Sequence, residues 1–159
     1  MRSFLTFVAF LLAVFAVAAV GGVAGASGVR EWYPHLNKPN WNPPEWIFGP
    51  VWTFLYVTIA VAGFLAWRHG GLRWAKTAMV LFTLQLILNA AWSWIFFGLH
   101  LPGWAFVEII LLWIAIVLTV AAFFRISKPA GLLLLPYLVW TTFAAVLNFS
   151  IYRLNDTSS

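Results

Sequence analysis

Five long apolar stretches constrain this chain more than any other feature of its sequence. A helix needs about 20 apolar residues to cross the hydrocarbon of a bilayer, and each stretch reaches that length. The stretches span residues 4–26, 47–66, 77–98, 103–124 and 130–152, and Glu108 is the one charged residue inside them. The sequence therefore predicts an all-α membrane protein, with residues 1–159 forming a single domain that is a bundle of five transmembrane helices.

The composition supports a membrane location and excludes several other classes of protein. Hydrophobic residues make up 64% of the 159 positions and charged residues 8%, with a mean hydropathy of +0.93. This balance leaves too little polar surface to cover a soluble protein. The basic residues are scattered singly, so we expect no nucleic-acid partner. Cysteine is absent, which excludes disulfides, thiolate catalysis and sulfur-ligated metals.

The first apolar stretch allows a second interpretation. Arg2, the apolar run and the small residues Gly25, Ala26 and Ser27 also fit a secretory signal peptide. The apolar run is longer than that of a typical signal peptide, which favours a retained helix. Gly21 and Gly25 form a GxxxG pair in this stretch and permit close helix contact, which we expect within the bundle rather than at a dimer seam.

Basic residues are distributed unevenly between the two ends of the predicted bundle. One end carries six of them and no acidic residue: Arg2, Arg68, Arg73, Lys76, Arg125 and Lys128. The other end carries Arg30, Lys38 and Arg153, offset by Glu31, Glu45 and Asp156. Because cytoplasmic loops are enriched in Lys and Arg, we expect a cytoplasmic N-terminus and an outward-facing first loop.

The predicted first loop, residues 27–46, is long enough to have structure of its own. Its four prolines restrict the backbone, and four aromatic side chains give it apolar mass: Trp32, Tyr33, Trp41 and Trp46. We expect an ordered lid whose rings lie on the bundle, with an ordinary interfacial aromatic belt as the alternative. Asn42 is predicted to cap the second helix, with Pro43 as its first residue.

Polar and aromatic side chains recur at similar depths beneath this loop. At about 1.5 Å per residue, counting from the outer helix ends places Trp52, Asn89, Trp92, Glu108 and Asn148 in the outer half of the membrane, with Trp140 deeper. Helical spacing puts Asn89 and Trp92 on one face, and Trp140, Ala144, Leu147 and Asn148 on another. Polar groups in hydrocarbon face the bundle interior, so we expect a pocket with the three indoles as walls and the two amides as hydrogen-bonding groups.

Other roles remain open for the polar residues of this region. The amides can instead bond across helices as structural links, which is the stronger interpretation for Asn148. Glu108 is a functional candidate because ionisable groups inside membranes are costly. Its shallow depth also allows it to reach the interface or to accept a hydrogen bond from His35 or Arg30.

Three segments carry a resemblance to a known family. They are WYPHLNKPNWNPPEWIFGPVWTFLY (32–56), LNAAWSWIFFGLHLPGWAFVEI (88–109) and LLPYLVWTTFAAVLNFSIYRLN (134–155). In this order they resemble the translocator protein family, also called peripheral-type benzodiazepine receptors, whose bacterial members are tryptophan-rich sensory proteins. The resemblance implies a bacterial membrane, a homodimer, and binding of porphyrins, haem-pathway intermediates and benzodiazepine-type ligands, with sterol-like lipids in animal members.

The resemblance also assigns residues to the ligand pocket. The family's pocket positions correspond to Trp52, Asn89, Trp92, Trp140, Ala144, Leu147 and Asn148, and its loop aromatics to Trp32, Tyr33 and Trp41. The sterol-recognition pattern of animal members is incomplete here, because Phe149 occupies the tyrosine position and Tyr152 directly precedes Arg153. We therefore do not expect sterol binding through that pattern.

Three functions are compatible with these features. The first is a sensor or regulator, in which indoles stack on a flat tetrapyrrole while Arg30, Lys38 or His35 meets its carboxylates. The second is a transporter of porphyrin or lipid, although the spans lack the several buried ionisable residues of coupled pumps. The third is light-dependent porphyrin breakdown with Trp52 and Trp140 as redox candidates. No residue constellation predicts a conventional enzyme, a metal site or a required cofactor.

Overall fold

The computed structural model describes residues 2–70 and 72–156, without the side chains at 2, 24 and 72–75, so Arg2 and Arg73 of the charge count lie outside the described side chains. Within this part, five long helices follow one another: α1 (Arg2–Ser27), α2 (Glu45–His69), α3 (Leu72–Ser93), α4 (Pro102–Ile126) and α5 (Lys128–Asp156). Each contains a segment long and apolar enough to cross a membrane. The predicted all-α fold with five transmembrane helices is confirmed.

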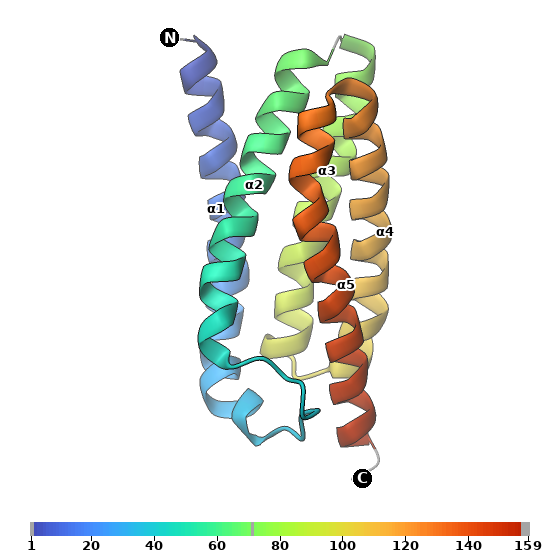
Figure 1. Cartoon of the computed structure of the whole chain (residues 1–159). Coiled ribbons are helices and arrows are strands. Elements are labelled where there is room, and N and C mark those ends of the chain that lie inside the picture. Colours follow the sequence, from blue (N-terminus) through green and yellow to red (C-terminus); the bar gives the residue numbers. More distant parts are fainter. Residues whose placement is uncertain (1, 71, 157–159) are drawn as a thin grey trace.

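The helices form a bundle with the start of α1 and the end of α5 at opposite ends (Figure 1). α4 packs against α3 and α5, α5 also packs against α2, and α1 packs against α2 and α3. The segment between α1 and α2 crosses the end of the bundle at which α5 finishes (Figure 1). We call this segment, residues 28–44, the lid.

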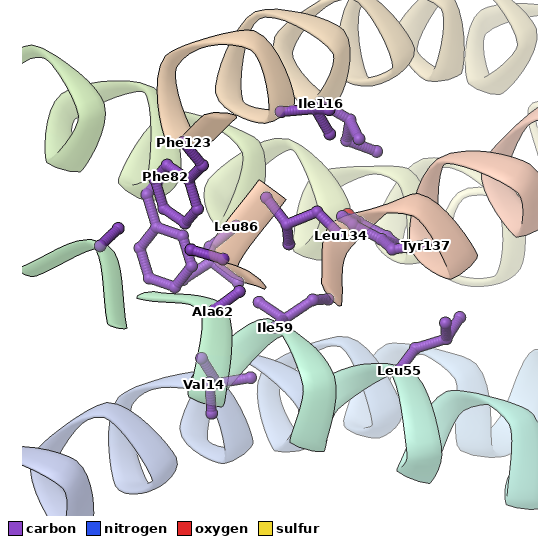
Figure 2. Close-up of a cluster of buried hydrophobic side chains, with 14 of the residues drawn as sticks. Val14, Leu55, Ile59, Ala62, Phe82, Leu86, Ile116, Phe123, Leu134 and Tyr137 are labelled. Carbon is purple, nitrogen blue, oxygen red and sulfur yellow. The ribbon is translucent and has the colours of Figure 1, made fainter. Parts of the chain in front are cut away.

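The core of the bundle is built from tightly packed apolar side chains. Figure 2 shows part of this core, in which Leu55, Ile59 and Leu134 are almost completely buried. Phe82 and Phe123 stack there with ring centroids 5.8 Å apart. Lipid tails are as apolar as these side chains, so close packing rather than water exclusion favours helix association. A smaller cluster beneath the lid consists of Tyr33, Phe96, Ala105, Leu147 and Ile151.

The lid contains more helix than the sequence predicts. A π-helical turn, η1 (Gly28–Trp32), continues α1, and a 3₁₀ turn, η2 (Tyr33–His35), follows it. Trp46 belongs to α2 and is 74% exposed, while Trp41 is 46% exposed. Three of the four aromatic rings expected on the bundle contact it: Trp32 and Tyr33 pack into the cluster beneath the lid, and Trp41 meets Phe143 of α5 edge-on. The largely exposed ring of Trp46 has the position expected of an interfacial belt.

The predicted cap of α2 is wrong. α2 begins at Glu45, and Pro44 occupies the position before it without a capping side-chain bond. The Asn42 side chain is used inside the lid instead, where its Oδ1 accepts a hydrogen bond of 2.8 Å from the Tyr33 hydroxyl. A second hydrogen bond runs from Asn42 Nδ2 to the Pro43 carbonyl. Competition from the buried tyrosine thus overrides the local preference for capping.

Hydrogen bonds fasten the lid to itself and to α5. Lys38 Nζ donates to the Tyr33 carbonyl at 2.7 Å and lies 4.7 Å from the centre of the Tyr33 ring. Asn155, on the last turn of α5, accepts a bond from the Asn37 N–H and donates one to the Asn37 carbonyl, both at 3.0 Å. The side chain of Asn155 therefore pairs with the lid backbone much as a neighbouring peptide unit does.

Gly28, the first residue of η1, allows the backbone after α1 to approach the end of the third span closely. A Cβ atom at this position would overlap the carbonyl oxygen of Phe97, in the π-helical turn η3 (Trp94–Gly98) that ends the third span. Backbone atoms cannot move aside as a flexible side chain can. Gly28 is therefore required where the lid leaves the bundle.

We predict that Gly28→Ala destabilises the folded protein by about 1–3 kcal/mol, because the added methyl group forces apart two packed backbones. Thermal unfolding in mild detergent measures this as a lowered midpoint. Gly22→Ala is the matched control, since a Cβ atom at Gly22 meets no other atom within 4 Å. Equal midpoints for the two variants would contradict this account of the lid junction.

Candidate ligand-binding site

A cavity of about 410 Å³ lies beneath the lid. Its wall comes from α1, the lid, α2, α3 with η3, and α5: Ala18, Gly21, Gly22, Gly25, Ala26, Val29, Arg30, Tyr33, Glu45, Phe48, Gly49, Trp52, Tyr56, Trp92, Ser93, Phe96, Phe97, Trp140, Ala144, Leu147, Asn148 and Ile151. In the described part of the chain, α4 contributes no residue to this wall. Cavities of this size and largely apolar lining are typical of small-molecule sites.

Flat aromatic surfaces dominate two sides of the cavity. Trp52 and Tyr56, one turn apart on α2, stack with centroids 5.3 Å apart and planes inclined by 29°. Trp92 and Phe96 stack in the same way at 5.2 Å and 23°. Such stacked pairs present π-faces on which a planar ligand can stack.

Trp140 stands on α5 and completes the aromatic wall. Its ring contacts that of Phe48 edge-on, with centroids 5.9 Å apart, and that of Phe143 with centroids 5.3 Å apart. One turn further along the same face come Ala144 and then Leu147 and Asn148, as the predicted helical spacing requires. The small side chain of Ala144 leaves room beside the indole of Trp140.

Asn89 supports the cavity wall from behind. Its amide is buried, accepts a hydrogen bond of 3.0 Å from the Tyr56 hydroxyl and donates one of 3.1 Å to the Tyr137 hydroxyl. The three side chains come from α3, α2 and α5. Asn89 therefore sets the position of a lining side chain, Tyr56, without lining the cavity itself.

Asn148 lines the cavity and also links three elements of the bundle. Its Oδ1 accepts a bond of 3.0 Å from Trp92 Nε1, and its Nδ2 donates one of 2.8 Å to the Pro102 carbonyl at the start of α4. These bonds agree with the interpretation of Asn148 as a structural link. The same bonds hold the Trp92 ring in the wall.

The mouth of the cavity has both signs of charge. Arg30 and Glu45 line it, whereas His35 and Lys38 do not, and Lys38 is engaged with the lid carbonyls. Burial raises the pKa of the Tyr33 phenol to about 12, and its hydrogen bond to Asn42 opposes this only in part. The phenol is therefore neutral at physiological pH, and this lid contact does not change with pH there.

Glu108 lies behind the wall rather than at the interface. It is 7% exposed, and neither carboxyl oxygen has a hydrogen-bond partner among the described residues. The alternative in which His35 or Arg30 donates a hydrogen bond to Glu108 is therefore not seen in the described part of the chain. Two contacts between α4 and α5 fix the height of Glu108. The ring centroids of Phe106 and Phe149 lie 4.9 Å apart, and Trp113 Nε1 donates a hydrogen bond of 2.8 Å to Thr142 Oγ1. Glu108 is therefore level with the part of α5 that lines the cavity.

Seven of the ten predicted site residues line one cavity: Tyr33, Trp52, Trp92, Trp140, Ala144, Leu147 and Asn148. The structure places the other three elsewhere. The Trp32 ring stacks on His100 with ring centroids 4.5 Å apart, and the Trp41 ring meets Phe143 edge-on with centroids 5.8 Å apart. Asn89 lies in the layer behind the wall.

Sequence reasoning missed several lining residues. Tyr56 follows Trp52 by four positions and Phe96 follows Trp92 by four, so helical spacing could have found both. Gly21 and Gly25 of α1 are predicted to pack against another helix, and Gly21 does so, because a Cβ atom there would come within 3.3 Å of Ser93 Oγ on α3. They also form one side of the cavity.

The five spanning helices and the lidded cavity define a class: an integral, multi-pass membrane protein with an internal aromatic pocket. The chain matches the TspO/MBR family over residues 9–153. It is 52% identical to the tryptophan-rich protein TspO of Chlorobaculum tepidum, over 78% of this chain and 79% of the relative. It is 42% identical to the human translocator protein, over 80% of this chain and 76% of the relative. The chain belongs to the TspO/MBR family.

We predict that Asn148→Leu destabilises the protein by about 1–3 kcal/mol, because the Trp92 N–H and the Pro102 carbonyl lose their partner in an apolar environment. Thermal unfolding in detergent measures the effect. Ser150→Ala on the same helix is the control, since its hydroxyl donates a hydrogen bond to the Val146 carbonyl one turn away, within α5. A midpoint for Asn148→Leu equal to that of the control would refute the linking role.

Proposed function

We propose that this protein is a membrane sensor or regulator that binds a porphyrin or a haem-pathway intermediate in the cavity beneath the lid. Membership of the TspO/MBR family supports a sensing or binding role at a membrane. A 40% identical relative from Cereibacter sphaeroides is named tryptophan-rich sensory protein. The observation that carries the proposal is the presence of two stacked aromatic pairs, Trp52 with Tyr56 and Trp92 with Phe96, around one cavity.

The chemistry of the lining fits a planar amphiphilic acid. A tetrapyrrole has a large π-face that the indoles can cover, and carboxylates that a guanidinium can bind through two parallel hydrogen bonds. Arg30 is the basic residue that lines the mouth. Benzodiazepine-type and sterol-like ligands share the apolar, ring-containing character that this wall accepts.

Light-dependent porphyrin breakdown is the second candidate function. It is favoured by one specific observation, which is that both proposed redox residues, Trp52 and Trp140, line the cavity. An indole in van der Waals contact with an excited porphyrin can exchange an electron with it. Such chemistry would act on the same ligand in the same site, so the two functions are separable only by experiment.

We predict that protoporphyrin binds the wild-type protein saturably and that Trp52→Leu weakens binding about 5- to 30-fold, since a stacking surface is lost. Asn89→Leu weakens it several-fold, because the Tyr56 hydroxyl loses its partner and the ring its position. Quenching of tryptophan fluorescence during titration measures both changes. Trp113→Phe is the control, because Trp113 bonds to Thr142 and is not part of the cavity wall.

The same variants separate sensing from photochemistry. If illumination destroys bound porphyrin, Trp52→Phe and Trp140→Phe retain binding but slow the loss of porphyrin absorbance. If the protein only senses its ligand, absorbance under light decays at the rate of free porphyrin in all variants. The binding proposal is abandoned if wild-type protein shows no saturable binding, or if Trp52→Leu and Asn89→Leu bind as tightly as wild type.

A further inference from the structure

Polar contacts of the lid cover the cavity on one side. Asn155 forms two hydrogen bonds to the Asn37 backbone, the Tyr33 hydroxyl bonds to Asn42, and Lys38 bonds to the Tyr33 carbonyl. Tyr33 also packs edge-on against Phe97 with centroids 5.8 Å apart. Opening the lid would require several of these contacts to break together.

Where α1 and α2 line the cavity, several of the lining residues are small. Three residues of α1 and α2 line the cavity and are exposed: Gly22, Ala26 and Gly49. A Cβ atom added at Gly22 or at Gly49 would meet no other atom within 4 Å. Both glycines therefore border unfilled space, and both lie in segments that can span a membrane.

The pattern along α1 points to the kind of ligand that could pass here. Ala18, Gly22, Ala26 and Arg30 line the cavity at intervals of four residues, which places three small side chains and one cation along one side. The three small residues lie within α1, and the cation lies beyond its end. An amphiphilic acid in the bilayer has its apolar and charged parts in the same order, with its rings in hydrocarbon and its acid group at head-group level.

We propose that the ligand enters and leaves the cavity sideways from the lipid, through an opening between α1 and α2 framed by Gly22, Ala26 and Gly49. The ligand class is a planar apolar acid that is already dissolved in the membrane, with Arg30 receiving its carboxylate. This inference rests on the proposed binding function. It assigns the lid the role of a fixed cover rather than a moving gate.

A chemical plug tests the opening. The chain has no cysteine, so Gly22→Cys introduces a unique thiol, and the small side chain has space in the folded protein. A bulky methanethiosulfonate reagent then fills the opening after folding, and a reductant removes it. Stopped-flow tryptophan quenching by protoporphyrin, with the protein in lipid nanodiscs, gives the association and dissociation rates before and after. Ala121→Cys, exposed on α4 and outside the cavity wall, is the matched control.

We expect the plug to slow association and dissociation together by about tenfold or more, because a blocked route affects both directions. A plug that merely clashed with bound ligand would speed dissociation, and that result, or unchanged rates, would overturn the proposal. In a second arm, a disulfide between Asn37→Cys and Asn155→Cys locks the lid. Association within about twofold of the reduced form supports the lateral route, and a much slower association overturns it. Absence of saturable binding to wild type would instead defeat the proposed function.

Discussion

The hydrogen bonds of Asn89 hold together the part of the bundle on which the cavity depends. One buried amide accepts from Tyr56 on α2 and donates to Tyr137 on α5, at 3.0 and 3.1 Å. Hydrocarbon offers no replacement partner, so each of these groups is costly to leave unpaired. Because Tyr56 stacks on Trp52, the amide on α3 determines where the aromatic surface of α2 lies.

Asn148 repeats this arrangement closer to the lid. It joins Trp92 on α3 to the first residue of α4, while its own side chain is part of the cavity wall. Two amides therefore orient aromatic rings that line the same cavity. The apolar rings supply the surface for a ligand, and the polar network behind them keeps that surface in place without filling the cavity.

Much of the fold and site could be predicted because membrane helices obey a simple length rule and a simple period. The apolar stretches located the spans, and the four-residue spacing on α5 placed Trp140, Ala144 and Asn148 on one face. Helical spacing does not say how deep a face lies within the bundle, so it could not predict that Asn89 lies behind the cavity wall rather than in it. Spacing also cannot anticipate competition between side chains. Asn42 bonds to Tyr33 instead of capping α2, and Trp32 stacks on His100 instead of lining the pocket.

The central claim is that one aromatic cavity beneath the lid binds a planar ligand. Indole N–H resonances of ¹⁵N-tryptophan-labelled protein in micelles, assigned by single Trp→Phe variants, report on each ring during titration with protoporphyrin. The account predicts saturable shifts for Trp52, Trp92 and Trp140, and unchanged signals for Trp67 and Trp113, which lie outside the cavity wall. Equal shifts of all five signals, or shifts confined to Trp67 and Trp113, would contradict it.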